Sequence, residues 1–188
     1  SYVTIIENTA EHYGGGMYVD NNSNSIFSHI TVTENIAHSR GGGISILKAG
    51  EDSRVNGVIS WSSPSSFLNR MPKDRIELWK ETGVTFIYNG RTKQNMPMYV
   101  QFYKDCIKNK NRLDIKKSIS NLNIPQLIIH GSADSTVDVK EAKDLHKWNS
   151  NSDIFIVQDA NHVFGSSHPY NSDTLPSDLQ KVINKTID

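Results

Sequence analysis

The chain has 188 residues with 20 Lys and Arg, 20 Asp and Glu, and a sequence pI of about 7.0. Because these charges balance, no net field attracts nucleic acid or an anionic membrane surface, and we expect neither as a partner. No stretch approaches the ~18 apolar residues of a membrane span, and no export signal opens the sequence. A single cysteine, Cys106, excludes an internal disulfide, so the reducing cytoplasm is the expected compartment.

The composition changes near residue 37. Residues 1–37 hold four acidic side chains and no Lys or Arg, whereas all basic residues and all six prolines lie further along. A single domain of ~150 residues accounts for the remaining length. The sequence therefore predicts a short N-terminal segment over 1–37 and one domain over 38–188.

The N-terminal segment contains an internal repeat. A shift of 27 positions superposes Thr4 on Thr31, Glu7 on Glu34, Asn8 on Asn35, Ala10 on Ala37, and the glycine run 14–16 on 41–43. Short strands between Asn, Ser and Gly turns, with a period in the twenties, are typical of solenoid coils. The pattern resembles right-handed parallel β-helix repeats of adhesins and surface proteins, a resemblance that favours a secreted or surface parent. Fewer than two coils are present, so no independent domain is expected here.

From residue 38 onward the pattern alternates between helices and strands. We expect a helix from the second glycine run to about Gly50, strands over 56–61, 125–130 and 153–157, and an amphipathic helix over 137–148. A last helix follows Pro176, with an apolar stripe of Leu179, Val182, Ile183 and Ile187. This alternation predicts an α/β fold with a parallel sheet and flanking helices. The aromatic-rich residues 64–115 are too many for a crossover, so we expect part of them to form a cap over the sheet's edge. Their aromatic side chains are expected in its core or, alternatively, in the wall of a substrate pocket.

Three polar residues stand near strand ends or helix starts. Ser39 precedes the first helix, Asp134 follows the second strand by four residues, and His162 follows the third by five. The carboxyl ends of parallel strands share one crevice, so the three side chains can converge. A histidine activates a serine hydroxyl, and a carboxylate fixes the tautomer of the histidine. The run His-Ser-Arg-Gly-Gly at 38–42 matches the nucleophile elbow G-x-S-x-G, with Ala37 at the first glycine.

Three longer runs carry a closer likeness to one family. They are Ser-Arg-Gly-Gly-Gly at 39–43, Leu-Ile-Ile-His-Gly-Ser-Ala-Asp at 127–134, and Ala-Asn-His-Val-Phe-Gly at 160–165. Together they resemble the dienelactone-hydrolase-like and small-esterase branch of the α/β-hydrolases over about 38–188. About four strands that precede the elbow in that family have no counterpart in residues 1–37. The resemblance therefore implies the C-terminal half of the family's sheet.

The resemblance also implies a chemistry. It assigns Ser39 as nucleophile, His162 as general base, Asp134 as orienting acid, and the backbone N–H of Arg40 as an oxyanion donor. The implied reaction is hydrolysis of a small-molecule ester or related acyl bond without metal or organic cofactor. The family's second oxyanion donor is missing, and losing one such donor typically costs ~10²- to 10³-fold in rate. An unpaired central strand would also leave an open sheet edge through which copies of the chain can associate.

Competing interpretations of Ser39 and of the whole chain stay open. The repeat aligns Ser39 with the turn at 12–14, so Ser39 is alternatively part of a second solenoid coil. A fusion of two sequences at a shared Gly-Gly-Gly accounts for both patterns. The chain is accordingly a serine esterase, an inactive truncated or fused fragment, or a structural module in which the repeat is the functional part.

The other candidate residues have alternatives of their own. Asp134 is alternatively a turn residue, and Asp138 is the competing carboxylate, although its position favours a helix cap. His168 is the alternative base. His130 ends a strand, and Cys106 lacks a partner histidine motif, so we expect structural roles for both.

Overall fold

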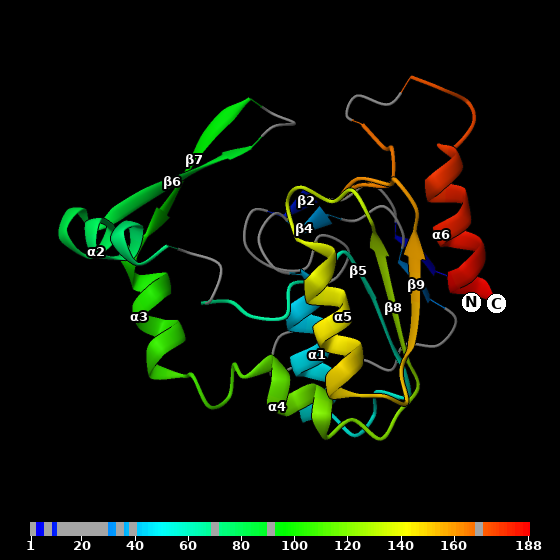
Figure 1. Cartoon of the computed structure of the whole chain (residues 1–188), viewed down its shortest axis with the longest axis horizontal. Helices are drawn as coiled ribbons and strands as arrows, with labels where there is room; N and C mark the ends of the chain where they lie inside the picture. The colour runs from blue at the N-terminus through cyan, green and yellow to red at the C-terminus, as the bar shows by residue number, and fades with distance from the viewer. Residues whose placement is uncertain are drawn as a thin grey trace.

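The computed structural model describes residues 3–5, 9–10, 30–32, 36–37, 41–68, 72–89, 93–167 and 171–188. Its main sheet has three parallel strands in the order β5 (Val58–Trp61), β8 (Gln126–Gly131), β9 (Asp153–Val157). Val58 aligns with Gln126, and Leu127 aligns with Asp153. The carboxyl ends of all three strands therefore meet at one end of the molecule, at the top of Figure 1.

Helices cover both faces of this sheet. On one face, α1 (Gly41–Glu51) packs on β5, α5 (Val139–Trp148) packs on β8, and α4 (Ile115–Ser120) contacts both helices. On the other face, α6 (Ser177–Ile187) packs against β9. The parallel α/β layers predicted from the alternating pattern are thus confirmed (Figure 1), and the strand bounds agree within two residues.

The strand periodicity explains this arrangement. Side chains alternate between the faces of a strand, so neighbours in β8 enter different cores. Ile128 packs under α1 and α5, whereas Ile129 packs under α6, and both are fully buried. Each such side chain contributes about 1.5–3 kcal/mol through burial. Because a strand buried on both faces needs apolar residues at consecutive positions, its sequence is a continuous apolar run, as at 127–129.

The last helix differs from expectation at one position. Leu179 and Val182 are buried in the core under α6, and Ile183 packs at its edge. Ile187 is 78% exposed, although it was predicted to belong to the same apolar stripe. Successive residues of a helix advance by 100°, so Ile187 lies about 110° from the midline between Leu179 and Val182. It is therefore on the solvent side of α6.

The expected cap segment forms a helix, a hairpin and a second helix. They are α2 (Lys73–Thr82), the antiparallel strands β6 (Val84–Asn89) and β7 (Gln94–Tyr99), and α3 (Val100–Lys108). Gly83 ends α2 with φ 76°, and its N–H donates to the Trp79 carbonyl at 3.0 Å. Figure 1 shows this lobe beside the α1 and α5 layer, with the hairpin extending toward the carboxyl end of the sheet.

The aromatic residues of this lobe fall into two groups. Trp79 is 2% exposed, stacks on Phe102 with centroids 6.4 Å apart, and donates its Nε1–H to the Met98 carbonyl at 2.8 Å. Phe67 is buried against α1 and α4. The prediction that the aromatics form a core is wrong for three others, which are more than half exposed: Phe86, Tyr88 and Tyr99. A two-stranded hairpin cannot cover its own faces, which explains their exposure.

The described N-terminal residues form two pairs of short parallel strands. Strand β1 (Val3–Ile5) pairs with β3 (Ile30–Val32), and β2 (Thr9–Ala10) pairs with β4 (Ile36–Ala37). Each residue is aligned with the one 27 positions later, the same offset as the sequence repeat. The glycine run 14–16 lies outside the described residues, and the β-helix identity of this segment stays a prediction.

Candidate active site

Two loops at the carboxyl end of the sheet are joined by backbone hydrogen bonds. The N–H groups of Ser132 and Ala133, after β8, donate to the carbonyls of Val157, at the end of β9, and Ala160, after it, at 2.9 and 3.0 Å. A Cβ on Gly131 would collide with the Ala160 carbonyl oxygen, so only glycine permits this close approach. The loops that carry Asp134 and His162 are therefore held together by the backbone itself.

Asp134 and His162 form a hydrogen-bonded pair across these loops. Nδ1 of His162 lies 2.8 Å from Oδ2 of Asp134. An ionised carboxylate can only accept, so Nδ1 carries the proton and Nε2 is the nitrogen available to act as a base. The Asp134 side chain is fully buried, whereas the His162 side chain is 36% exposed. One end of the imidazole is thus fixed inside the protein, and the other is accessible from outside.

The second oxygen of Asp134 has a different function. Oδ1 accepts the backbone N–H groups of Thr136 and Val137, both at 2.8 Å. This is the turn role considered as the alternative to catalysis. The two interpretations of Asp134 are compatible because each uses a different oxygen of the carboxylate.

A third group reaches the same carboxylate. His130 is 0% exposed, and its Nε2 lies 2.8 Å from the Val137 carbonyl and 3.2 Å from Oδ2 of Asp134. Burial alone would raise the pKa of Asp134, but hydrogen bonds from the two imidazoles and the Val137 N–H outweigh it. They hold the pKa of that carboxyl well below its usual value. Asp134 is therefore a stable anion at neutral pH.

The loop of His162 is also held from the side of β5. Ser62, the residue after β5, donates its hydroxyl to the His162 carbonyl at 3.1 Å and its N–H to the Ile129 carbonyl at 2.8 Å. Ser62 has φ 48°, a left-handed conformation that costs a non-glycine residue about 1–2 kcal/mol. Asp159 and Phe164, on the loop itself, also have positive φ, at 59° and 54°. Such strained positions concentrate at functional sites.

The start of α1 lies against the residue that follows Ser62. A Cβ on Gly42 would lie 2.6 Å from both Cβ and Oγ of Ser63, and one on Gly43 would lie 3.0 Å from Cζ of Phe67. Gly42 and Gly43 thus allow α1 to pack closely against the residues that follow β5. An unbroken chain of contacts links the first turn of α1 to Ser63, Ser62 and His162.

Several candidates from the sequence lie elsewhere. Ser39 and Arg40, expected as nucleophile and oxyanion donor, fall outside the described residues, as does the alternative base His168. Asp138 caps α5 by accepting the Lys140 N–H at 2.8 Å, as expected. Cys106 is buried, in agreement with its predicted structural role.

Neither a metal site nor a membrane helix is found in the part of the chain that the structure describes. No group of three or more His, Cys, Asp or Glu side chains is arranged there to hold a metal ion. None of the helices in that part is both long and apolar enough to cross a membrane.

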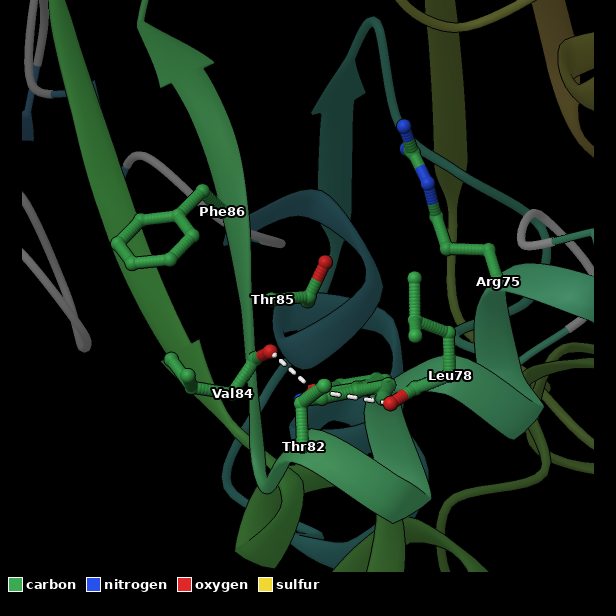
Figure 2. Close-up of a pocket in the computed structure, with 7 residues that line it drawn as sticks. Arg75, Leu78, Thr82, Val84, Thr85 and Phe86 are labelled. Atoms are coloured by element: carbon green, nitrogen blue, oxygen red, sulfur yellow. Dashed lines mark hydrogen bonds between the residues drawn. The ribbon is translucent and has the colours of Figure 1, made fainter.

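Two clefts lie elsewhere in the described part of the chain, and neither includes Asp134 or His162 in its walls. One, of about 450 Å³, lies within the cap between α2 and β6 and is lined by Leu78, Trp79 and Phe86, with Arg75 at its edge (Figure 2). The other, of about 760 Å³, lies between residues 65–68, the segment from α3 to α4, and α5. Phe67 connects this larger cleft to the start of α1 because its ring also faces Gly43.

Two residues of the site could not be identified from the sequence. His130 ends a strand in an apolar run and was expected to be structural, yet the turn at 131–134 brings Asp134 back onto its ring. Their spacing of four residues across a Gly-containing turn is the only sequence signal of this contact. Ser62 has no signal, since its contact with His162 spans 100 residues.

Comparison with solved structures identifies the fold. Similar structures include Est1E from Butyrivibrio proteoclasticus, at a TM-score of 0.53 and 15% identity, over 84% of this chain and 59% of that one. A monoacylglycerol lipase from Paleococcus ferrophilus has a TM-score of 0.51 at 16% identity, over 80% and 66% of the two chains. A hydrolase candidate from Agrobacterium vitis S4 reaches 0.57 at 15% identity, over 78% and 57%. The chain has an α/β-hydrolase fold.

The likeness extends no further than the fold. Identities of 15–16% show the α/β-hydrolase architecture alone, and the chain spans 57–66% of the length of these three proteins. No family model and no curated protein matches the sequence. The dienelactone-hydrolase-like branch therefore stays a prediction.

Proposed function

We propose that this chain is a serine hydrolase that cleaves an ester or a related acyl bond of a small molecule. Ser39 is the nucleophile, His162 is the general base, and Asp134 orients and stabilises the imidazole. The backbone N–H of Arg40 is one donor to the oxyanion. The observation that carries the proposal is the 2.8 Å hydrogen bond from His162 Nδ1 to a buried carboxylate, beside the first turn of α1.

The position of α1 supports the assignment of Ser39. Ser39 is two residues before α1 in the sequence, and the first turn of α1 lies against Ser63, next to the residue that binds the His162 carbonyl. In the sequence, Ser39 thus shortly precedes a turn whose neighbour, Ser63, is next to the residue that binds the His162 carbonyl. The positive end of the helix dipole favours the developing negative charge at the same place.

The proposed reaction has two steps. Ser39 Oγ attacks the acyl carbon while Nε2 of His162 takes the hydroxyl proton, and the carbonyl oxygen becomes an oxyanion that accepts the Arg40 N–H. His162 returns that proton to the leaving alcohol as its bond to the acyl carbon breaks. A water molecule then attacks the acyl-enzyme, with His162 again as base, and releases the acid and free Ser39. Asp134 keeps the imidazole in the Nδ1–H tautomer throughout.

The 760 Å³ cleft is the proposed site for the acyl group. Its lining includes the buried Phe67 and the partly buried Leu68, Leu113 and Trp148, together with several Lys and Asp side chains. The apolar part of this lining begins next to the start of α1 and suits a small or medium acyl chain. Filling the cleft with Leu113→Trp should shift the preference toward shorter acyl chains in a series of p-nitrophenyl esters.

Covalent labelling tests the proposed function directly. A fluorophosphonate should modify Ser39, as located by mass spectrometry, and Ser39→Ala should abolish the modification. Labelling requires a single reaction of the nucleophile and no turnover, so it can be followed over hours even where a missing oxyanion donor slows it. A folded protein that resists labelling, or one labelled equally in Ser39→Ala, would overturn the assignment.

The N-terminal strands favour a second candidate. Their parallel pairing at an offset of 27 residues supports a β-helix-like coil, and β5 has no partner other than β8 within the described residues. In this case the chain joins part of a repeat protein to an incomplete and inactive hydrolase domain. Sequencing the parent locus in single long reads would reveal a breakpoint between residues 30 and 46. Well-folded, unlabelled protein at the expected molecular mass would favour this candidate.

A further inference from the structure

His130 is a buried titratable side chain that the proposed reaction does not use. It lies near the end of β8, fully enclosed between the sheet and the start of α5. Its Nε2 faces two oxygens, the Val137 carbonyl at 2.8 Å and Asp134 Oδ2 at 3.2 Å. Both oxygens are acceptors, so Nε2 must carry the proton.

The other ring nitrogen of His130, Nδ1, faces no comparable pair of oxygens. Nδ1 of His130 is buried and has no hydrogen-bond partner among the described residues. An unpartnered buried polar atom costs about 1–3 kcal/mol, and an apolar residue of the same shape would avoid this cost. The ring is therefore poorly suited to its place as a packing element. Its N–H is the feature that an apolar residue could not supply.

The contacts of Asp134 indicate what this N–H does. Oδ1 is held by two backbone N–H groups of the turn, and Oδ2 is left to face two imidazoles. If the carboxylate rotated away from His162, Oδ2 would also leave the His130 N–H at 3.2 Å, and that buried N–H would keep the Val137 carbonyl alone as acceptor. The hydrogen bond to the Val137 carbonyl also fixes the turn that supplies those two backbone donors.

We propose that His130 is a positioning residue that acts through its Nε2–H, holding Asp134 Oδ2 in the orientation that receives the proton of His162. The proposal rests on the proposed function for its catalytic meaning, but its geometry concerns the Asp134–His162 hydrogen bond itself. The effect of His130 on this hydrogen bond can therefore be measured whether or not the chain turns over a substrate.

Three substitutions of His130 distinguish the role of its Nε2–H donor from that of its ring. Gln places an amide N–H close to the position of Nε2, whereas the shorter Asn reaches only the position of Nδ1, and Phe keeps the ring without any donor. His130→Gln should preserve the function of the residue, and His130→Asn and His130→Phe should lose it. His146→Phe is the matched control, because His146 is a part-buried histidine of α5 that pairs with Ser152 Oγ at 2.9 Å, away from the site.

The primary measurement is proton NMR of the His162 Nδ1–H. A histidine N–H bonded to a buried carboxylate gives a far-downfield resonance that exchanges slowly with water. We expect this resonance in the unmodified protein, His130→Gln and His146→Phe, and its loss or fast exchange in His130→Asn and His130→Phe. With an active enzyme, the two deficient variants should lose about 10²-fold in kcat, with KM little changed.

The outcomes distinguish this proposal from the proposed function. A resonance that persists in folded His130→Phe overturns the positioning role, as does its equal loss in the Gln and Asn variants. If His130→Phe fails to fold, the comparison of Gln with Asn still decides, because both keep a polar side chain and differ in reach. If the protein shows the expected NMR pattern but is not labelled by a fluorophosphonate, the hydrolase assignment is overturned and the positioning role of His130 stands.

Discussion

Asp134 binds His162 through one carboxylate oxygen and its own turn through the other. Asp134→Asn keeps the size of the side chain but replaces one oxygen by an amide that donates. N–H groups lie on both sides of the side chain, so the one amide oxygen can accept either from the turn or from the imidazoles. When it accepts from the turn, the Nδ1–H of His162 loses its acceptor. We expect kcat for ester hydrolysis to fall by roughly 10³- to 10⁴-fold, measured with a p-nitrophenyl ester.

The control for this change is the same substitution four residues further along. Asp138→Asn keeps a good helix N-cap on α5 and touches neither histidine. Asp138 also lines the proposed acyl cleft, so an effect on acyl binding would change KM, whereas kcat should equal that of the unmodified protein. If Asp138→Asn were the inactive variant and Asp134→Asn the active one, Asp138 would be the catalytic acid and the assignment here would be wrong.

The depressed pKa of Asp134 predicts a dependence of stability on pH. A carboxyl whose folded pKa lies below its unfolded value of about 3.9 stabilises the fold by a constant amount above that value. This contribution shrinks as the pH falls below about 4 and vanishes once the pH passes the folded pKa. The stability difference between the unmodified protein and Asp134→Asn should therefore be constant from pH 7 to 5 and narrow toward pH 3. Urea unfolding at each pH measures it, and a difference that grows on acidification would contradict the prediction.

Gly42 allows α1 to approach the end of β5. Gly42→Ala would place a methyl group 2.6 Å from Cβ and Oγ of Ser63, and relieving this overlap should cost about 1–3 kcal/mol in unfolding free energy. Fluorophosphonate labelling should slow as well, because the start of α1 moves. Gly50→Ala is the matched control on the same helix, with its nearest atom, Ser118 Cβ, at 3.4 Å. It should be neutral or stabilise by up to about 1 kcal/mol.

Ser62 combines a strained backbone with a hydrogen bond to the His162 loop. Ser62→Ala and Ser62→Gly both remove the hydroxyl, but only glycine also relieves the strain at φ 48°. We expect Ser62→Gly to be more stable than Ser62→Ala by about 1–2 kcal/mol, while both lower kcat. Urea unfolding and steady-state kinetics on the two variants test this. Equal stabilities would show that the backbone at this position carries no strain.

Much of the fold follows from local patterns in the sequence. The apolar run at 127–129 and the amphipathic pattern before Trp148 correspond to β8 and α5 within two residues. These elements are predictable because a short continuous apolar run between turn residues is typical of a strand buried on both faces, whereas apolar residues three or four positions apart are typical of a helix buried on one. Ile187 shows the limit of prediction from periodicity, because the spacing of apolar residues along a helix does not show where the sheet surface that covers them ends.

The site was predictable only where its residues follow strand ends. Asp134 and His162 could be inferred because parallel strands bring their following loops together. The contacts of His130 and Ser62 depend on the path of a turn and on a positive φ at a serine, and neither is encoded by a residue type with that preference. The exposed aromatics of the hairpin were likewise unpredictable, because composition does not reveal whether another layer covers them.

Among the described residues, β5 has a strand partner on one edge only, and from this we predict self-association through its other edge. The N–H groups of Val58 and Ser62 donate to the β8 side, so the N–H of Ile59 faces the other edge, where the described residues include no strand partner. The Ile59 side chain is also 44% exposed. We expect oligomers that grow with concentration in sedimentation experiments. Ile59→Lys should reduce them because a charge opposes edge pairing, whereas Ile187→Lys, an equal change on exposed α6, should not. A strictly monomeric protein, or equal effects of both variants, would exclude this edge as the contact.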